Sequence, residues 1–256
     1  MKRGAAQMSN IVDAVKALTR APALFYLDLR HTYFALRFAT GVLGLLLPLV
    51  LVGWGLAHQV GWNQMGSLSA FYWLSQSPPA DSNALLRNWF VGSLVAVGTC
   101  LIIYRGYGHL EDRLLNLAGL AAAAVALNPM PWPQLHEDKL QIHYVAAVVF
   151  FLLIAATIWF CARDTLFAIA DARVRARWAV IYKIFAIAML AVPLTGFLLA
   201  QRAHQTIWIE ALGVWVFSGY WFVKTYELSH VSMIEPAKGP APRLRRVKGS
   251  LEIMRS

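Results

Sequence analysis

Charged side chains are scarce in this sequence and make up 14% of its 256 residues. Soluble domains carry roughly 25%, so the chain has too little polar surface to cover a water-soluble domain of its size. The 59% of hydrophobic residues exclude an intrinsically disordered chain. Only two cysteines are present, which excludes a disulfide-rich scaffold. With a mean hydropathy of +0.53, the composition indicates an integral membrane protein.

The formal net charge is +10, but the positions of the basic residues argue against a nucleic-acid partner. Lys and Arg lie in the loops and tails between apolar runs, which is the distribution typical of membrane topology. Cys100 and Cys161 each lie inside an apolar run, where buried free thiols are expected. The predicted partner is the lipid bilayer, with a small-molecule or lipid ligand as a candidate, no nucleic acid, and any protein partner unknown.

Apolar runs suited to crossing a bilayer, which takes about 20 residues, occur six times. The first run is longer than the ~7–15-residue core of a signal peptide and has no small-x-small cleavage site at its end, so we expect it to be a retained anchor. The third run is short and alanine-rich, and Pro129 follows it. The predicted fold class is all-α, a compact polytopic bundle of six transmembrane helices. The runs cover residues 33–57, 88–104, 113–128, 142–162, 178–200 and 206–224.

The orientation follows from the basic residues, since Lys and Arg are retained on the cytoplasmic side. With a cytoplasmic N-terminus and six spans, all but three of the 23 Lys and Arg residues lie inside, the exceptions being Arg87, Lys139 and Arg202. Both termini are therefore predicted to be cytoplasmic, in a multi-pass protein of the inner (plasma) membrane. Arg37, within one turn of the cytoplasmic end, is expected to snorkel. The predicted regions are a cytoplasmic segment with an interfacial amphipathic helix (1–32), the six-helix transmembrane domain (33–226) and a basic cytoplasmic tail (227–256).

One carboxylate, Glu210, lies about one turn inside the sixth run. A carboxylate in lipid is costly, so this side chain must face protein, water or a cation. Three interpretations stay open, of which we slightly favour an interhelical ion pair with Arg87. Alternatively, Glu210 lines an outward-facing pocket together with Arg87, Asn88 and His143, or it is solvated at the membrane interface.

The long loop over residues 58–87 contains the run GSLSAFYW at 66–73. Serines and aromatic residues with few charges predict a re-entrant or interfacial segment that lies over the helix ends. Ser69 and Tyr72 therefore join the pocket candidates, with the segment acting as a lid. The alternative is a surface loop anchored by Tyr72 and Trp73.

A metal site is a further hypothesis, because His143 and His204 lie at helix starts close in depth to Glu210. Two imidazoles and a carboxylate are typical of zinc with an open water position, and facing histidines can also hold haem. The sequence contains neither an H-E-x-x-H nor an H-x-x-x-H pair. No cofactor is therefore expected, with zinc or haem kept as alternatives.

Five motifs follow one another in a fixed order between residues 33 and 226. They read SLSAFY at 67–72, RNWFVG at 87–92, YRGY at 104–107, D…N-x-A-G at 112–119 and H-Y-x-x-A…F-F at 143–151. In this order and spacing they resemble a family of uncharacterised prokaryotic six-span integral membrane proteins. The family has no established activity, so the resemblance implies a six-span fold and no particular reaction.

Ser, Asp and His at helix ends are also distantly similar to those of the alkaline ceramidase and adiponectin receptor superfamily. Those hydrolases have seven spans and a paired-histidine motif in the last helix, where this chain offers only His204 and Glu210. Two functions therefore stay open. The chain either binds or passes a small molecule or lipid at an outward-facing polar pocket, or supports a membrane partner. The alternative is a metal-dependent integral-membrane hydrolase that acts on a lipid-like substrate through His143, His204 and Glu210.

Overall fold

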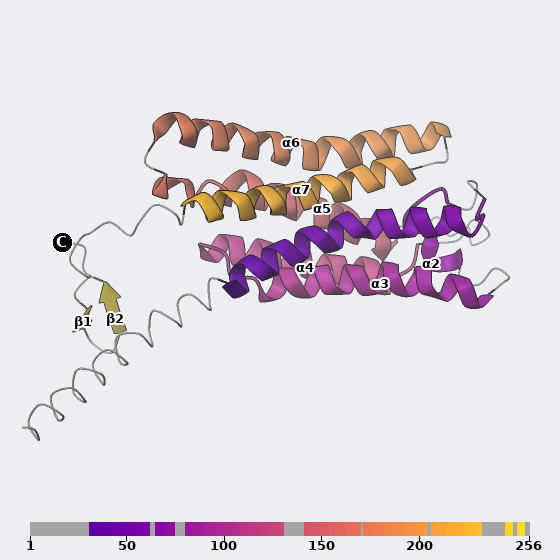
Figure 1. Ribbon diagram of the computed structural model, residues 1–256, viewed down its shortest axis with the longest axis horizontal. Coiled ribbons are helices and arrows are strands. Elements are labelled where there is room, and N and C mark those ends of the chain that lie inside the picture. Colours follow the sequence, from indigo (N-terminus) through magenta and orange to yellow (C-terminus); the bar gives the residue numbers. More distant parts are fainter. Residues whose placement is uncertain are drawn as a thin grey trace, which may run out of the picture.

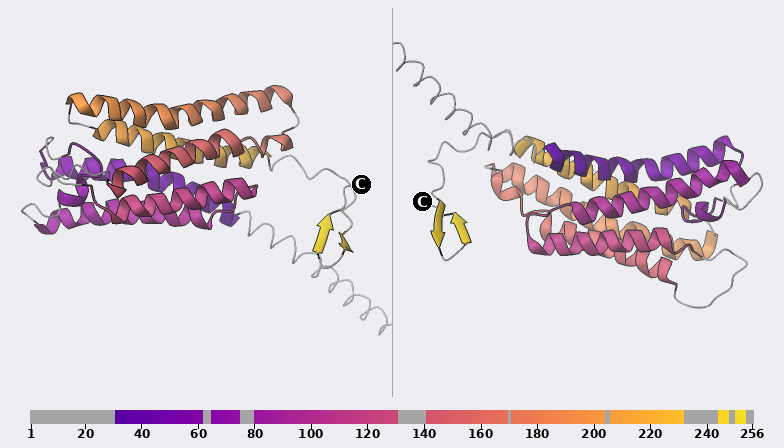
Figure 2. Two further views of the ribbon diagram at one scale, coloured as in Figure 1. Left: turned by 180° about the vertical axis from the view of Figure 1, so that it is seen from behind. Right: turned by 90° about the horizontal axis from the view of Figure 1, so that it is seen from below.

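Long helices lie side by side along the length of the molecule in this computed structural model (Figures 1 and 2). The residues that the structure describes are 31–61, 65–74, 80–130, 141–169, 171–203, 206–231, 244–247 and 250–253. The amphipathic helix predicted within residues 1–32, at residues 10–20, lies outside these ranges.

Each of the six predicted apolar runs coincides with one long helix, which confirms the all-α fold class of the bundle. The short elements α2 and the 3-10 helix η1 lie in the connections, and a strand pair lies in the C-terminal tail, where β1 and β2 are antiparallel. The long helices are His31–Ala57, α3 (Ala80–Ile103), α4 (His109–Leu127), α5 (Ile142–Cys161), α6 (Ala172–Ala203) and α7 (Ile207–Val231). The short elements are α2 (Phe71–Leu74), η1 (Leu166–Ala168), β1 (Leu244–Val247) and β2 (Ser250–Ile253).

Four helices in the described part of the chain are long and apolar enough to cross a membrane. α4 and α7 are not among them, and both contain charged residues, such as Glu111 in α4 and Lys224 in α7. The structure is thus an all-helical bundle compatible with a membrane-embedded protein, while the count of six spans stays a prediction. The four helices are His31–Ala57, Leu85–Ile103, Ile142–Cys161 and Ala172–Thr195.

Consecutive helices from α3 to α7 pack against one another, and the helix His31–Ala57 closes the bundle against α7. Gly44 permits this approach, because a Cβ there would lie 2.4 Å from Oγ of Ser218 in α7. We call the end of the bundle that holds residues 65–74 the plug end. The opposite end, where α5 leads into α6 through Arg163 and Arg173, is the arginine end.

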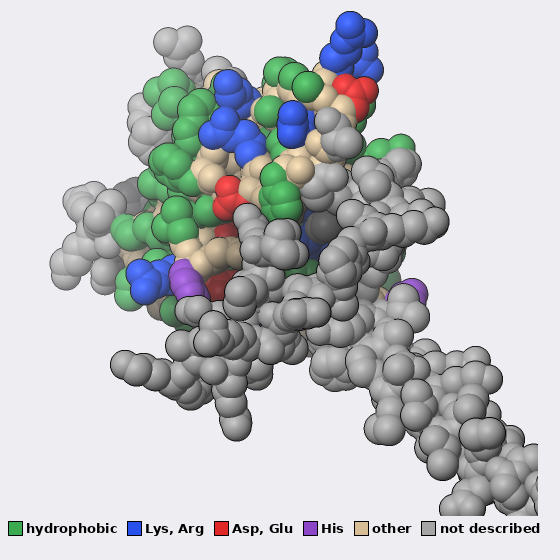
Figure 3. Space-filling model, turned by 90° about the vertical axis from the view of Figure 1, so that its left-hand side faces the viewer, with side chains coloured by type: hydrophobic (Ala, Val, Ile, Leu, Met, Phe, Trp, Pro, Cys, Tyr) green, Lys and Arg blue, Asp and Glu red, His purple; other side chains and the backbone are tan. Residues whose placement is uncertain are grey.

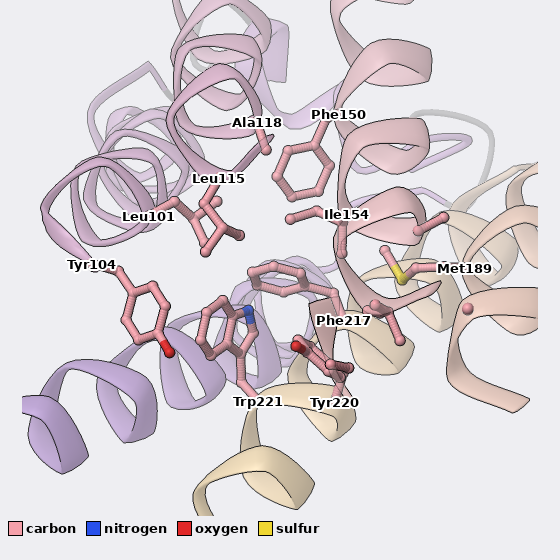
Figure 4. Packing of buried hydrophobic residues seen from close by; sticks show 14 of the residues in the cluster. Leu101, Tyr104, Leu115, Ala118, Phe150, Ile154, Met189, Phe217, Tyr220 and Trp221 are labelled. Atoms are coloured by element: carbon pink, nitrogen blue, oxygen red, sulfur yellow. The ribbon is translucent and has the colours of Figure 1, made fainter. Parts of the chain in front are cut away.

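The middle of the bundle is filled by large apolar side chains from α3, α4, α5 and α7. Phe150 and Phe217 contact each other at 5.5 Å between ring centroids, and Phe217 lies edge-on to Trp221. Leu115 of α4 and Ile154 of α5 point into the same cluster (Figure 4). This apolar layer separates the polar groups of the plug end from those of the arginine end.

α3 and α4 cross at two glycines. A Cβ on Gly98 would lie 2.7 Å from the carbonyl oxygen of Gly119, and a Cβ on Gly119 would lie 2.5 Å from that of Gly98. Small residues allow such close backbone contact between membrane helices. A methyl group at either position would force the two helices apart.

We expect Gly98→Ala and Gly119→Ala to destabilise the bundle by about 1–3 kcal/mol, the usual cost of overpacking. The matched control is Gly92→Ala in α3, where an added Cβ meets nothing within 4 Å. This control is expected to be neutral or stabilising, because alanine favours helix more than glycine does. Thermal unfolding in detergent measures all three variants, and equal melting temperatures for Gly98→Ala and Gly92→Ala would contradict the close crossing.

Candidate functional site

Residues 65–74, which we call the plug segment, enter the bundle at the plug end. Met65 and Phe71 are fully buried, and Leu68 is nearly so. They pack in one apolar cluster with Leu51 of the first helix and Leu86 of α3. The burial agrees with a re-entrant segment and not with a loop on the surface.

The backbone of the plug segment caps the start of α7. The N–H groups of Thr206 and Ile207 both donate to the carbonyl oxygen of Gly66, at 2.7 and 3.0 Å. The first N–H groups of a helix have no partner within the helix. The plug segment supplies an acceptor at this position, so the start of α7 and the plug segment hold each other in place.

Glu210, in the first turn of α7, binds the plug segment through its side chain. Its Oε2 atom accepts hydrogen bonds from the hydroxyl of Ser67 and from the backbone N–H of Leu68, both at 2.9 Å. Its Oε1 atom accepts a hydrogen bond from the hydroxyl of Thr206. The carboxylate also lies in the first turn of α7, where the helix dipole attracts negative charge. Neutral donors and the helix terminus therefore stabilise Glu210.

The favoured ion pair between Glu210 and Arg87 is wrong. The ion pairs among the described residues are Arg105–Asp112 and Lys224–Glu227. The guanidinium of Arg87 lies 6.0 Å from the ring centroid of Tyr72 instead. The reason is that the plug segment brings donors closer to the carboxylate than any cation.

His143, in the first turn of α5, binds the plug segment from the other side. Its Nδ1 atom lies 2.7 Å from the carbonyl oxygen of Asn128, and its Nε2 atom lies 3.0 Å from Oγ of Ser69. Because a carbonyl oxygen can only accept, Nδ1 carries the proton and Nε2 accepts the hydroxyl proton of Ser69. His143 thus links the end of α4, the start of α5 and the plug segment.

Five of the six pocket candidates take part in contacts at the plug end. Ser69 and Tyr72 belong to the plug segment, and Glu210, His143 and Arg87 contact it. The sixth candidate, Asn88, has an exposed side chain and is not part of these contacts.

The metal hypothesis fits the described residues poorly. Within them, no three His, Cys, Asp or Glu side chains are grouped to hold a metal ion. Both nitrogens of His143 are hydrogen-bonded, and Glu210 binds Ser67 and Leu68. His204 lies outside the described residues. Zinc would have to replace the contacts that hold the plug segment.

A second polar cluster, at the arginine end, was not predicted. Lys224 and Glu227 of α7 are 2% and 0% exposed and form an ion pair of 3.0 Å. Nζ of Lys224 also donates to the carbonyl oxygen of Ala162 and to Oγ1 of Thr165, both at 2.6 Å. The carboxylate of Glu227 accepts from Thr165 at 2.7 Å and from the hydroxyl of Tyr182. The cluster joins α7 to the α5–α6 turn and to α6.

The Lys224–Glu227 cluster also explains why α7 is longer than predicted. The sixth apolar run ends at residue 224, and the basic tail was predicted to begin at residue 227, but α7 continues to Val231. Charged residues there satisfy each other inside the bundle, so they do not end the helix. Their i,i+3 spacing was the sequence signal that could have identified the pair.

Arg37 belongs to the same end and does not snorkel as predicted. Its side chain is 5% exposed and donates a hydrogen bond to the hydroxyl of Tyr104. The guanidinium lies 4.9 Å from the ring centroid of Tyr104 and 5.5 Å from that of Tyr33. Aromatic faces attract a desolvated cation, which accounts for its inward position.

Comparison of the chain with protein-family models, with curated proteins and with solved structures gives no match. The resemblance to a six-span family therefore stays a prediction.

Replacing one partner of the buried pair by Lys224→Met or Glu227→Gln should destabilise the bundle by about 3–5 kcal/mol, because the other charge is left uncompensated. The double variant should recover much of this loss. The control is Arg105→Gln in the Arg105–Asp112 pair, whose arginine side chain is 77% exposed and should change stability by less than about 1 kcal/mol. Thermal unfolding in detergent measures the cycle, and additive losses would contradict the coupling.

Glu210→Gln should cost about 1–3 kcal/mol, since it leaves a buried donor of the plug segment without an acceptor. Because Glu210 does not pair with Arg87, the losses of Glu210→Gln and Arg87→Met should add to within about 0.5 kcal/mol. If the double variant were more stable than this sum predicts, Glu210 and Arg87 would be coupled, and the prediction would be wrong.

Proposed function

We propose that this chain is a six-span membrane protein with both termini cytoplasmic, and that it binds a small molecule or a lipid headgroup at its plug end without covalent chemistry. The observation that carries the proposal is the half-buried carboxylate of Glu210, whose hydrogen bonds to Ser67 and Leu68 come from the plug segment. Ionisable groups within membrane helices are functional candidates by default. The plug segment is then a lid that occupies the site of the ligand.

The orientation is supported by the distribution of the basic residues. Of the 23 Lys and Arg residues in the sequence, the six-span topology predicts that only Arg87, Lys139 and Arg202 lie on the side of the plug segment. Positive residues remain on the cytoplasmic side. The plug end therefore faces outward in this proposal, and the arginine end faces the cytoplasm of a cell whose inner membrane holds the chain.

The chemistry of the plug end indicates the class of ligand. Oε2 of Glu210 accepts one O–H and one N–H, and Nε2 of His143 accepts the O–H of Ser69. A ligand with amine or hydroxyl groups would replace these donors one for one. If the plug segment moved away and no ligand replaced its donors, the acceptor atoms of Glu210 and His143 would be left unsatisfied, which is costly.

Binding is favoured over passage across the membrane because apolar side chains such as Phe150, Ile154 and Phe217 fill the middle of the bundle. The metal-dependent hydrolase has less support, because both nitrogens of His143 already hold the structure together.

Opening of the plug segment is testable by cysteine accessibility. Ala70 is 5% exposed, lies within the plug segment and makes none of its side-chain hydrogen bonds, so Ala70→Cys reports on the lid. A membrane-impermeant maleimide applied outside intact cells should label it slowly, and Glu210→Gln should speed labelling by about tenfold or more, since roughly 1.4 kcal/mol is a factor of ten. Cys100 and Cys161 are first replaced by alanine.

Two matched alanines serve as controls at the same end. Ala57→Cys is exposed and should label fast in both backgrounds, and Ala211→Cys is fully buried and should not label. Ethanolamine, as an amine probe, should raise the melting temperature of the wild type and not of Glu210→Gln. Labelling of Ala70→Cys that matches Ala211→Cys in both backgrounds, with no shift by ethanolamine, would overturn the proposal.

A further inference from the structure

A groove of about 270 Å³ lies between α5 and α6, away from the plug segment. Its floor is made by small side chains, Ala155 and Ala156 of α5 and Ala186 of α6. Two large side chains form its rims, Trp159 at 44% and Ile187 at 58% exposed. The groove is almost wholly apolar and opens on the outer surface of the bundle, so hydrocarbon fits it.

A group of cations lies where this groove approaches the arginine end. Arg163 follows Trp159 by four residues and lies just beyond α5. Lys183 precedes Ile187 by four residues on α6, so the two share a helix face one turn apart. The first turns of α6 add Arg173, Arg175 and Arg177, and all five cations are exposed.

The cations of this group outnumber the nearby carboxylates. Asp164 and Asp171 are the acidic residues of the α5–α6 turn, and neither forms an ion pair with these cations among the described residues. The Oδ1 atom of Asp171 accepts the backbone N–H of Arg173 at 2.7 Å. Figure 3, which faces this end, shows Lys and Arg side chains beside hydrophobic ones.

We propose that the groove and these cations together bind an anionic phospholipid, with an acyl chain between α5 and α6 and the phosphate on the arginines. An apolar groove alone would take the acyl chain of any lipid, so the positive charge at its end selects the anionic headgroup. Basic pockets between membrane helices bind such headgroups, and each nearby cation contributes about 1 kcal/mol. Arginine suits the task because its planar guanidinium binds phosphate oxygens in pairs. Trp159 lies where an indole ring favours the headgroup level.

The site is separate from the plug segment, so the proposal does not rest on the lid. It commits to a lipid of the bilayer, because the groove is built for a hydrocarbon chain. A free phosphate would need only the cations, and an acidic peptide would need no deep apolar floor.

The test uses the full chain in detergent, titrated with phosphatidylglycerol or with phosphatidylcholine of the same acyl chains, and counts bound lipid by native mass spectrometry. Phosphatidylglycerol should bind at least tenfold more tightly to the wild type. Arg173→Gln, Arg175→Gln and Arg177→Gln should each weaken it about fivefold, the equivalent of about 1 kcal/mol per cation, and should leave phosphatidylcholine unchanged. Exposed substitutions of this kind rarely disturb a fold.

Two controls separate the site from general effects of charge and of volume. Arg105→Gln with Arg113→Gln removes two exposed cations at the same end, one in the α3–α4 turn and one near the start of α4, and should not change binding. Ala156→Leu fills the groove and should reduce the binding of both lipids, whereas Ala188→Leu on α6 lies outside its lining and should not.

Equal affinity for the two lipids would overturn the proposal, as would unchanged binding in Ala156→Leu. An equal loss of phosphatidylglycerol affinity in the Arg105→Gln/Arg113→Gln control would show that the lipid is attracted by the overall positive charge of this end and not by a specific site. Inorganic phosphate or a poly-glutamate peptide that displaces phosphatidylglycerol fully would show that the cations act without the groove, which also contradicts it.

Discussion

Charged side chains that this bundle draws inward bind partners inside the protein, and these contacts determine how the two ends are built. Water is absent from the hydrocarbon region of a bilayer, so an unsatisfied donor or acceptor there costs several kcal/mol. Lys224 and Glu227 meet the requirement by joining α7 to the α5–α6 turn. Glu210 meets it by holding a segment that is not itself a long helix. Each buried charge thus becomes a connection between elements that apolar packing alone would leave free to slide.

The two ends meet this constraint with different chemistry. At the arginine end, the opposite charges of Lys224 and Glu227 compensate each other, and a second buried cation, Arg37, rests on the faces of Tyr33 and Tyr104. At the plug end, Glu210 is compensated by neutral hydroxyl and amide donors. Neutral donors can be exchanged for those of a ligand with little change in electrostatic energy, whereas one member of an ion pair cannot leave without exposing the other. This difference is the reason why we propose the plug end, and not the Lys224–Glu227 pair, as the place where a ligand binds.

Much of the fold could be predicted from the pattern of apolar runs and prolines along the sequence. The lengths of the apolar runs locate all the long helices, and Pro129 marks the end of α4 at Leu127. The sequence also predicted that Glu210 must face protein, water or a cation, and in the structure this half-buried carboxylate faces the plug segment. The hydrogen-bond partners of Glu210 could not be predicted, because no sequence pattern marks a backbone N–H such as that of Leu68 as a donor to a side chain. The Lys224–Glu227 pair was missed for another reason: charges near the end of a run are typical of the membrane surface.

The order of the chain has a consequence for how the plug end is assembled during synthesis. Ser67 and Glu210 are 143 residues apart, so a ribosome adding about 5–20 residues per second completes Ser67 on the order of 10 s before Glu210. Throughout that interval the buried residues of the segment, such as Phe71, have no α7 to receive them. The nascent chain must therefore hold an apolar, serine-containing loop at the membrane surface until its last helix arrives. A chain interrupted before that helix would present this loop to the quality-control machinery of the cell.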